Sequence, residues 1–480
     1  MVSTTPSRSQ EIRSRVGHPI IDSDGHTLEV MPLVVEFVGE VGGAKMRERY
    51  QRGLDEAVGV HWHEMSQVQR NYEFVTAPGW WFETPGALDR VTSTIPRLLH
   101  ERMDELGIDY AVLYPTQGLF FDRIPDPEVR QAGCRGLNAY LAEVYRPYAD
   151  RMTPAAAIPM QTPEMAIEEL EYAVNELGLK VAMIEGRAMR PLIKVEKEYP
   201  DLGNVGRRMD VLTIDSDYDY DPFWAKCVEL NVAPASHAAN MGWGTRSTSN
   251  YMYNHLNTFS AAHESLAKAL FLGGVTRRFP ELRVAFLEGG VGWACRLFSD
   301  IIGHWEKRGA RGIRELDPRH LDIDAVMGFI AEKGEPPQKA RLEEIRDLYV
   351  AGEPQPEELD DFARVPMERP EEMLDLFVKP FFFGCEADDP MNAHAFNTKV
   401  NPLGARLRAI FSSDIGHWDV TDVREVVEEA YELVERELIT EEDFRDFTFA
   451  NAAHFYGDMN PDFFKGTVVE SEAVRELGGG

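Results

Sequence analysis

The sequence predicts an α/β fold, a (β/α)8 barrel of the TIM type, and three observations lead to this prediction. Eight short apolar runs recur along the 480 residues, each about as long as a buried strand. Helical patterns lie between most of these runs, which is typical of parallel strands joined by crossover helices. Polar side chains follow several runs, at the strand ends where such barrels carry their chemistry.

The eight candidate strands are runs of apolar, aromatic and β-branched residues that end in glycine or in polar groups. Because they alternate with helical segments, they favour a closed barrel over a doubly wound open sheet. The strands are expected at 19–26, 109–115, 152–160, 181–186, 232–237, 283–290, 379–388 and 408–417.

The helices between the strands are indicated by their start and stop signals. In the clearest case, Thr162 is placed to cap a helix, Pro163 fits its first turn and Gly178 ends it. Gly107 ends another helix in the same way. The expected helices cover 95–107, 162–178, 221–231 and 418–438.

Three insertions explain why the chain is longer than a minimal barrel. The barrel domain is expected over 20–465, after an N-terminal extension of 1–19. It precedes a tail of 466–480 whose end, RELGGG, we expect to be disordered. The third insertion is rich in Glu, Asp and Pro, and we expect it to be exposed and partly helical. The insertions follow strands one, four and six, at about 31–96, 187–221 and 304–375.

The chain is strongly acidic, with 81 Asp and Glu against 50 Lys and Arg and a net charge of −31. This charge argues against binding to nucleic acid or to an anionic membrane surface. No apolar stretch is long enough for a membrane span, and the first residues lack the apolar core of a secretory signal. Four isolated cysteines argue against a disulfide scaffold or a zinc ribbon. We therefore expect a cytoplasmic protein that acts on a small molecule.

The first strand ends in an unusual way, with the sequence IIDSDGHTLEV at 20–30. Burying a carboxylate or an imidazole costs several kcal/mol unless another group compensates for it. Asp24 and His26 are two residues apart and therefore face the same way in a strand. A solvated turn would explain this pair, and so would a metal ion.

Three other predicted strands end in comparable groups. His237 ends the fifth strand, Glu288 ends the sixth, and Asp414 followed by His417 ends the eighth. Each residue alone is explained by a helix cap or by a hydrogen-bonded structural histidine. Together, imidazoles and carboxylates that converge on one barrel axis would suit Zn²⁺, Mn²⁺, Fe²⁺ or Co²⁺.

A set of longer motifs carries a family resemblance. The motifs include IIDSDGHTLEV, MDELGIDYAVLYPTQGL, DPFWAKCVELNVAPASH, RRFPELRVAFLEGGVGW, FSSDIGHWD and FANAAHFYG. Through them the chain resembles the amidohydrolase superfamily, in the branch typified by aminocarboxymuconate semialdehyde decarboxylase and related metal-dependent hydrolases. The resemblance extends over about 20–464. It implies a distorted (β/α)8 barrel, in agreement with the strand count.

The resemblance also implies a metal site with the ligands Asp24, His26, His237 and Asp414. It implies one divalent ion, with zinc as the first choice and manganese, iron or cobalt as alternatives. The chain departs from the family pattern at Asp24 and at Glu288, since histidine is common at both positions. The fourth strand offers no lysine for carbamylation, so a bridged two-metal site is not expected.

Three hypotheses of function follow. The first is a metal-dependent hydrolase that cleaves an amide, ester or C–C bond of a small organic substrate. In it, a metal-activated water passes its proton to Asp414, with assistance from Glu288 or His417. The alternative is a metal-dependent, non-oxidative decarboxylase of an aromatic or unsaturated carboxylic acid. There, Arg187 and Arg190 would hold a substrate carboxylate, unless they are ordinary surface arginines. The third is a binding barrel without catalysis, which the two departures from the family pattern would explain.

Aromatic and amide side chains are expected near the barrel mouth. Trp80, Trp81, Tyr114 and Gln117 would shape an apolar substrate pocket, or they would serve in packing alone.

The sequence alone leaves two more features undecided. His61 and His63 in the segment HWHE are a second candidate metal pair, and a loop with two exposed histidines explains them as well. By analogy with related barrels, we expect a homo-oligomer, most simply a dimer.

Overall fold

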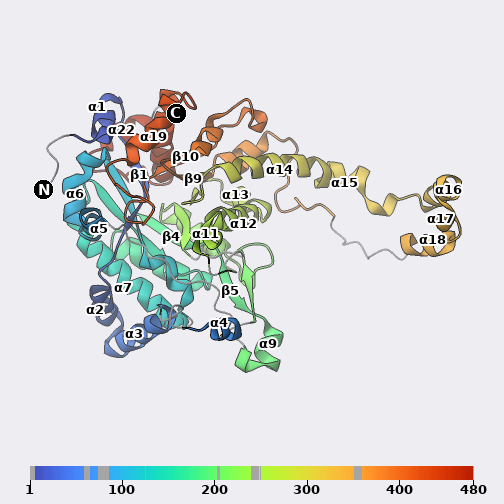
Figure 1. The fold of residues 1–480 in the computed structure, drawn as a ribbon, viewed down its shortest axis with the longest axis horizontal. Coiled ribbons are helices and arrows are strands. Elements are labelled where there is room, and N and C mark those ends of the chain that lie inside the picture. The colour runs from blue at the N-terminus through green and yellow to red at the C-terminus, as the bar shows by residue number, and fades with distance from the viewer. Residues whose placement is uncertain are drawn as a thin grey trace.

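The computed structural model describes residues 6–58, 65–73, 86–124, 126–202, 206–238, 248, 250–350 and 359–478. Eight of its strands form one sheet in the order β1-β2-β3-β4-β7-β8-β9-β10, and neighbouring strands are parallel. Helices surround this sheet (Figure 1), so the predicted distorted (β/α)8 barrel is confirmed. The strands are β1 Ile21–Thr27, β2 Tyr110–Pro115, β3 Met152–Ile158, β4 Val181–Glu185, β7 Pro234–Ala238, β8 Val284–Phe286, β9 Phe381–Glu386 and β10 Arg408–Ser412.

The expected helix signals are found at the helix ends. The Thr162 hydroxyl accepts a hydrogen bond from the Met165 N–H at the start of α8, and Gly107 ends α6 with a φ of 74°. The helices are α1 Arg8–Arg15, α2 Met31–Gly42, α3 Ala44–Val58, α4 Gln67–Glu73, α5 Ala87–Thr94, α6 Pro96–Leu106, α7 Pro127–Tyr145, α8 Pro163–Glu171, α9 Ile193–Glu198, α10 Asp221–Glu229, α11 Tyr251–His255, α12 Thr258–Leu272, α13 Val275–Arg278, α14 Gly292–Arg308, α15 Ala310–Leu316, α16 Ile323–Lys333, α17 Pro336–Lys339, α18 Leu342–Val350, α19 Val426–Glu435, α20 Glu441–Arg445, α21 Asn451–Gly457 and α22 Glu470–Gly478.

The barrel closes where its first strand meets the end of its last. The His26 N–H donates to the Ile415 carbonyl at 3.0 Å, and the Asp414 N–H donates to the Asp24 carbonyl at 3.0 Å. The buried Asp22 carboxylate strengthens this seam, because it accepts the Ser413 N–H at 2.9 Å and the Ser413 hydroxyl at 2.6 Å. The seam therefore brings the ends of β1 and β10 together, which is where the sequence predicts metal ligands.

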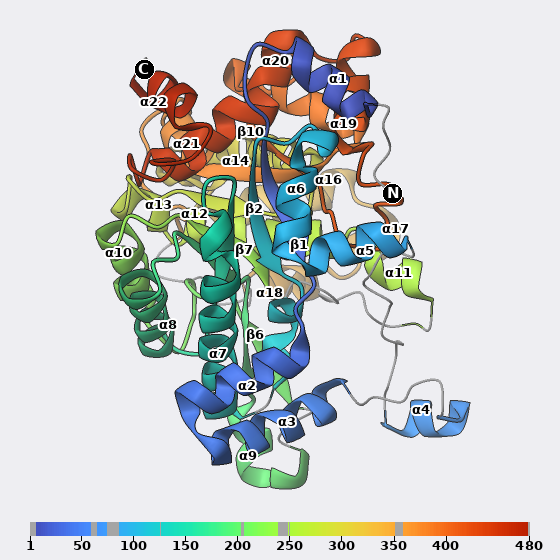
Figure 2. The same ribbon diagram turned by 90° about the vertical axis from the view of Figure 1, so that its left-hand side faces the viewer.

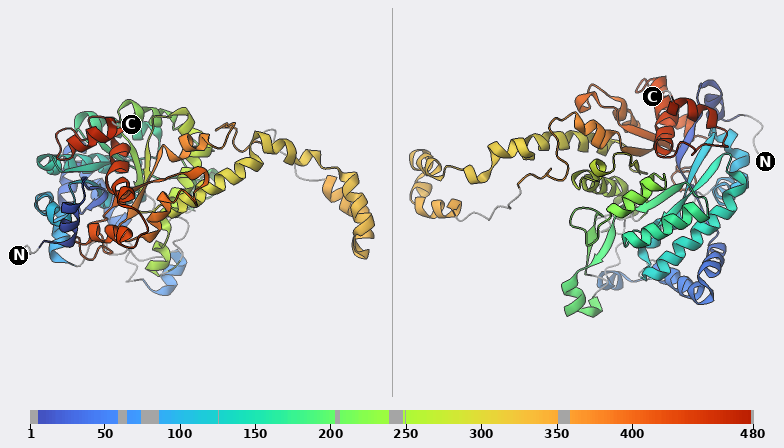
Figure 3. Two further views of the ribbon diagram at one scale, coloured as in Figure 1. Left: turned by 90° about the horizontal axis from the view of Figure 1, so that it is seen from above. Right: turned by 180° about the vertical axis from the view of Figure 1, so that it is seen from behind.

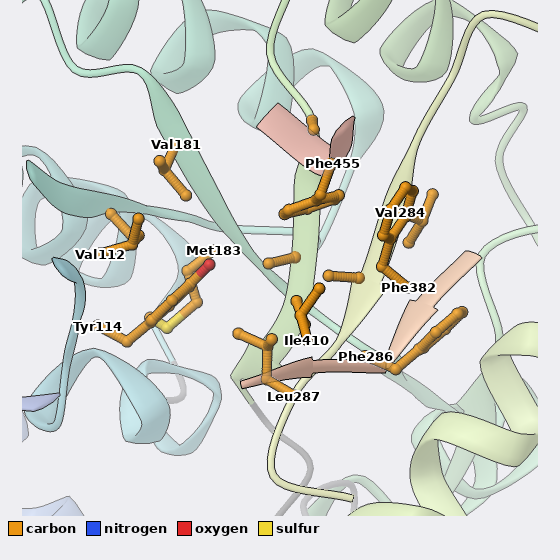
Figure 4. Packing of buried hydrophobic residues seen from close by; sticks show 14 of the residues in the cluster. Val112, Tyr114, Val181, Met183, Val284, Phe286, Leu287, Phe382, Ile410 and Phe455 are labelled. Atoms are coloured by element: carbon orange, nitrogen blue, oxygen red, sulfur yellow. The ribbon is translucent and has the colours of Figure 1, made fainter. Parts of the chain in front are cut away.

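The barrel interior is filled by apolar side chains from most of the strands. Figure 4 shows them meeting at the centre, with Tyr114 and Met183 on one side and Phe286 and Phe382 on the other. All four of these side chains are fully buried. Such packing makes the interior a solid core, so ligands can approach only at the strand ends.

The insertion after β4 contains a two-stranded antiparallel sheet that the sequence analysis did not predict. Its strands are β5 Ala188–Pro191 and β6 Arg207–Asp210. The hairpin and α9 lie at the same end of the barrel as α2 and α3, which follow β1 (Figures 1 and 2). The two insertions therefore extend one end of the barrel.

The helices that follow β8 form an arm, defined as α15 to α18, which continues from the end of α14. The arm projects far from the barrel in both views of Figure 3. The sequence predicts an exposed and partly helical insertion here. The structure adds that this segment stands away from the body.

The C-terminal tail is helical, which corrects the expectation of disorder for the residues up to 478. In α22, Ala473 is buried, and just before the helix Val469 is buried too. Leu477 packs so closely on Gly457 of α21 that a Cβ at that glycine would lie 2.4 Å from the leucine Cδ1. The reason is a short apolar stripe at helical spacing, which the polar composition of the tail conceals.

Among the helices that the structure describes, none has the length and apolar character that crossing a membrane requires.

Candidate metal centre

Four of the predicted ligands converge at the carboxyl end of the barrel. Asp24 and His26 come from β1, His237 from β7, and Asp414 follows β10. His26 Nε2 lies 3.1 Å from His237 Nε2 and 3.4 Å from Asp414 Oδ1. Asp24 Oδ1 lies 3.7 Å from His26 Nε2 and 3.5 Å from His237 Nε2. All four side chains are buried, so their polar atoms face one another and not solvent.

The distances among Asp24, His26 and His237 fit one shared divalent ion, while Asp414 forms a second such group with His26, Glu288 and His417. With metal–ligand distances of about 2.1 Å, two ligands at the tetrahedral angle lie about 3.4 Å apart. When both rings carry their proton on Nδ1, the two facing Nε2 atoms present lone pairs that cannot bond each other but can both bind a cation. Both carboxylate oxygens of Asp24 are buried without a hydrogen-bond partner in the described part of the chain. Buried polar groups of this kind need a partner, and a cation between them satisfies all of them.

Glu288 and Asp414 hold unusual backbone conformations. Glu288 follows β8 with a φ of 58°, and Asp414 follows β10 with a φ of 51°. Residues with a side chain rarely adopt this left-handed region, so each position stores backbone strain. The strain turns both carboxyl groups toward the cluster, where Glu288 Oε2 lies 3.5 Å from His237 Nε2.

Burial controls the charge of these groups. Burial, followed by the charge of Asp24, raises the pKa of Glu288 well above its usual range. Burial raises the pKa of Asp24 and Asp414 in the same direction. Burial also lowers the pKa of His26 and His237 well below the usual value, which keeps both imidazoles neutral. A divalent cation would reverse the effect on the ligand carboxylates, because its charge favours their ionised form.

His417 and Thr116 connect two of the ligands through a second layer. The Thr116 hydroxyl lies 3.4 Å from His26 Nδ1 and 3.3 Å from His417 Nε2. His417 Nδ1 lies 2.7 Å from Asp414 Oδ1. If His26 ligates through Nε2, its Nδ1–H donates to the Thr116 hydroxyl, which in turn donates to His417 Nε2. These two hydrogen bonds fix the orientation of the His26 ring, and His417 also lies beside the Asp414 carboxylate.

A cavity of about 230 Å³ lies beside the cluster, and Glu288 lines it. Leu256 and Phe259 contribute apolar surface, while Glu386 and Asp419 contribute carboxyl groups. Burial, followed by the charge of Asp419, raises the pKa of Glu386 to about 8. At neutral pH this wall therefore presents a neutral carboxylic acid that can donate a hydrogen bond.

The predicted substrate-binding residues lie in different places. The ring of Tyr114 is buried and meets the His237 ring edge-on, with centroids 5.7 Å apart, so it packs against a candidate ligand. The backbone N–H of Gln117 donates to the Glu29 carboxylate at 3.1 Å. Arg187 is half-buried, with Nη1 3.7 Å from the Met189 sulfur. None of these three placements shows a contact with the described cavity wall.

Arg190 is a buried structural residue in the described contacts. Its guanidinium donates to Asp210 Oδ2 at 2.8 Å and to the Tyr220 hydroxyl at 2.8 Å, and it also donates to the Gln161 carbonyl. These bonds tie the β5–β6 hairpin to the barrel, so its placement favours a structural role. Trp80, Trp81, His61 and His63 lie outside the described residues.

Thr116 and Glu386 were not predicted from the sequence. Thr116 directly follows β2 and Glu386 ends β9, so both stand at strand ends like the predicted ligands. Their position at strand ends was the signal that could have identified them. Their local sequence pointed elsewhere, because YPTQG is typical of a turn and GCEADD is typical of an acidic loop.

Comparison with known proteins adds the following findings. A family model described as amidohydrolase matches residues 60–457. The chain is 28% identical to the gamma-resorcylate decarboxylase of Rhodococcus jostii (strain RHA1) over 199 residues, 41% of this chain and 56% of that protein. It is 31% identical to the gamma-resorcylate decarboxylase of Rhizobium sp. (strain MTP-10005) over 143 residues, 29% of this chain and 37% of that protein. The match therefore spans about half the length of these relatives or less.

Among solved structures, the chain is similar to a dihydroxybenzoic acid decarboxylase from Polaromonas sp. JS666, solved with bound manganese and the inhibitor 2-nitroresorcinol. The two are 17% identical, the match covers 92% of this chain and 97% of the other, and the TM-score is 0.48. The family assignment does not depend on this likeness, because the family model alone extends over most of the barrel. The eight-stranded barrel, the ligand cluster at its carboxyl end and the match over residues 60–457 agree, and the chain belongs to the amidohydrolase family.

Proposed function

We propose that the chain is a metal-dependent carboxy-lyase that releases CO2 from a hydroxylated aromatic carboxylic acid. Support comes from the similarity to gamma-resorcylate decarboxylases, which covers less than half of this chain. The single observation that carries the proposal is the place of Glu288, which lines the cavity and also contacts the ligand cluster. Hydrolysis, the first expectation from the sequence, becomes the second candidate.

The ligand set supports a divalent ion held by Asp24, His26, His237 and Asp414. When bound, such an ion would supply a positive charge that holds substrate oxygens and polarises them. Two imidazoles and two carboxylates suit zinc, manganese, iron and cobalt, so all four stay candidates. The negative charges of the two aspartates balance a divalent ion, which leaves the site close to neutral.

Glu288 would supply the proton that decarboxylation requires. When the bond between the ring carbon and the carboxylate breaks, CO2 leaves and the electron pair stays on the ring carbon. That carbon then takes a proton from the Glu288 carboxyl group, and Glu288 regains a proton from bulk solvent, so one proton is consumed for each CO2 released. A buried carboxyl group with a raised pKa is suited to this task, because burial favours its protonated form, which can donate.

The cavity wall would orient the substrate. Leu256 and Phe259 offer apolar contact to an aromatic ring, and the neutral carboxyl group of Glu386 can donate to a phenol or carboxylate oxygen. Arg187, predicted from the sequence to hold the carboxylate, lies outside the described wall of this cavity and would have to reach the substrate from the β4 end.

The hydrolase candidate is favoured by one observation of its own. Asp414 Oδ1 lies 2.7 Å from His417 Nδ1, so carboxylate and imidazole form a pair that can take a proton from a water molecule. The same pair also serves to hold a ligand in place, and so it does not require hydrolysis.

Solvent isotopes separate the two reactions. Purified protein, loaded in turn with Mn²⁺ and Zn²⁺, is incubated with a panel of hydroxybenzoates and a panel of esters and amides. Decarboxylation in D2O is expected to place deuterium on the product ring carbon and to release CO2. Hydrolysis in H2¹⁸O would instead place ¹⁸O in a product. Glu288→Gln is expected to lower CO2 release by about 10² or more while metal content stays unchanged.

The outcomes have distinct meanings. ¹⁸O in a product without CO2 release would replace the proposal with the hydrolase candidate. No turnover of either panel by a fully metal-loaded chain would leave the binding barrel without catalysis. Unchanged CO2 release in Glu288→Gln would remove Glu288 as the proton donor.

A further inference from the structure

A buried histidine outside the ligand cluster contacts the turn that carries Glu288. His263 lies on α12, and its Nε2 donates to the Leu287 carbonyl, one residue before Glu288. A carbonyl oxygen only accepts hydrogen bonds, so the ring carries its proton on Nε2. His263 and Leu287 are fully buried, so water cannot easily replace this hydrogen bond. The histidine therefore fixes one defined point of the backbone in this turn.

The position of the Leu287 carbonyl determines the conformation of the next residue. This carbonyl belongs to the planar peptide unit that sets the φ of Glu288, which is 58°. A residue with a side chain stays in this left-handed region only where its surroundings hold it there. Without the N–H of His263, the buried carbonyl would lack this partner, and the peptide unit would rotate to find another. The φ of Glu288 would then become negative, and its carboxyl group would turn away from His237.

Two neighbouring strands hold the ends of the turn, and α12 holds its middle. The Leu287 N–H donates to a carbonyl of β7 at 3.2 Å, and the Gly290 N–H donates to a carbonyl of β9 at 3.1 Å. The helix packs so closely on the turn that a Cβ at Gly289 would lie 2.8 Å from His263 Cδ2. His263 therefore acts directly on the part of the turn where Glu288 lies.

We infer that His263 is a positioning residue for Glu288, and this inference rests on the proposed role of Glu288 as the proton donor. The histidine holds the Leu287 carbonyl, and the peptide unit then directs the Glu288 carboxyl group toward the ligand cluster and the cavity. His263 is not part of the described cavity wall, so it acts on the reaction through Glu288. Burial lowers the pKa of His263 to about 4, so the ring is neutral at neutral pH and keeps one N–H.

The kinetics of two variants test this role. His263→Leu removes the N–H and keeps a side chain of similar size, whereas His263→Gln keeps an N–H donor. In metal-loaded His263→Leu, kcat for CO2 release is expected to fall about 10- to 100-fold, because the proton donor is misplaced. KM and metal content are expected to stay unchanged, because the cavity wall and the ligands remain. His263→Gln is expected to recover most of the lost kcat. Equal losses of kcat in the two variants would overturn the inference.

A double variant separates positioning from a general loss of structure. A residue that acts through Glu288 has no further effect once that carboxyl group is gone, so His263→Leu/Glu288→Gln should be as active as Glu288→Gln. A further loss of about tenfold or more would contradict the inference. His18 is the matched control, since it is also buried and its Nε2 lies 3.1 Å from the Thr448 hydroxyl, at the amino end of β1. His18→Leu should leave kcat unchanged, and a loss like that of His263→Leu would also count against the role of His263.

Failure of the proposed function has a different signature. If the wild type hydrolyses its substrate instead, the same variants are compared on that reaction. If the wild type shows no turnover at all, crystal structures decide. The φ of Glu288 is expected to be positive in the wild type and in His263→Gln, and negative in His263→Leu. A positive φ in His263→Leu would overturn the inference, whether or not the chain is active.

Discussion

The ligand aspartates show how a functional side chain can cost stability. Asp414→Asn keeps a residue that tolerates the left-handed backbone at φ 51° but removes the buried charge. We expect metal content to fall well below that of the wild type. In metal-free protein we expect stability to rise by about 1 kcal/mol, because a desolvated carboxyl group near Glu288 is neutralised. Plasma mass spectrometry and thermal unfolding with and without EDTA measure the two effects. A metal-free variant less stable than the wild type would contradict this account.

A substitution at Thr116 is expected to change the metal affinity of the site without disturbing the fold. Thr116→Val removes the hydroxyl between His26 and His417 but keeps the branched shape. We expect metal affinity to fall about 10- to 100-fold, the usual effect of losing a group that orients a ligand. Thr116→Ser keeps the hydroxyl and should retain most of the affinity. Competition with a chromogenic chelator gives both values, and equal affinity in the valine and serine variants would show that the hydroxyl has no orienting role.

Residue by residue, the sequence predicted the groups that carry charge at strand ends. Asp24, His26 and His237 lie together at the strand ends and Asp414 lies beside His26, because period-two alternation and strand order determine where such side chains point, while their role as metal ligands stays a prediction. The connection through Thr116 could not be predicted, since it depends on a contact between residues far apart in the chain. The place of Arg190 could not be predicted for the same reason, because its partner Asp210 belongs to an unforeseen strand.

At the scale of elements, the β5–β6 hairpin depends on one buried ion pair. Arg190 and Asp210 are almost fully buried and lie 2.8 Å apart. Asp210→Ala leaves the arginine charge buried and unpaired, so we expect a loss of about 3–5 kcal/mol. The double variant Arg190→Met/Asp210→Leu replaces the pair with apolar groups and should recover most of that loss. Urea unfolding measures all three proteins. A double variant as unstable as Asp210→Ala would argue against this reasoning.

The hairpin also shows which strands cannot be predicted from local sequence. The eight barrel strands are short, buried and apolar, so composition alone indicates them. β5 reads AMRP and β6 reads RRMD, and neither shows a run of apolar residues or a clear alternation. Their pairing depends on contacts across an insertion, and local sequence does not encode those contacts.

For the whole molecule, buried acids predict how stability depends on pH. Burial raises the pKa of Glu29 to about 8, and burial with the charge of Asp419 raises the pKa of Glu386 to about 8. In the unfolded chain such groups lose their proton near pH 4–5. Between pH 7 and 8 the folded chain therefore binds more protons than the unfolded chain, and its stability falls as pH rises. Each group contributes a slope of up to about 1.4 kcal/mol per pH unit.

Urea unfolding in EDTA at pH 7.0, 7.5 and 8.0 measures this slope. Glu386→Gln should reduce it by the share of one carboxyl group, while Glu371→Gln, at an exposed position, should leave it unchanged. Histidines with a lowered pKa do not change the slope between pH 7 and 8, because they destabilise the folded chain only below about pH 6.5. A flat profile in the wild type would contradict the prediction.

The global fold was predictable from the sequence because eight buried strands alternating with helices leave few topologies. The outward position of the arm was not predictable, because charged helices have the same composition whether they pack on the barrel or stand away from it. The helical tail escaped prediction because its packing on Gly457 depends on the tertiary fold.

The seam between β1 and β10 means that the ligand set is complete only after the closing strand has been made. Asp24 and His26 belong to the first strand of the barrel and are made before Asp414, which follows its last strand. A nascent or truncated polypeptide that stops before β10 has no closing strand and no fourth ligand. Ion capture by all four ligands would therefore wait until the last strand of the barrel has been made, and an ion once held would join the first strand to the last.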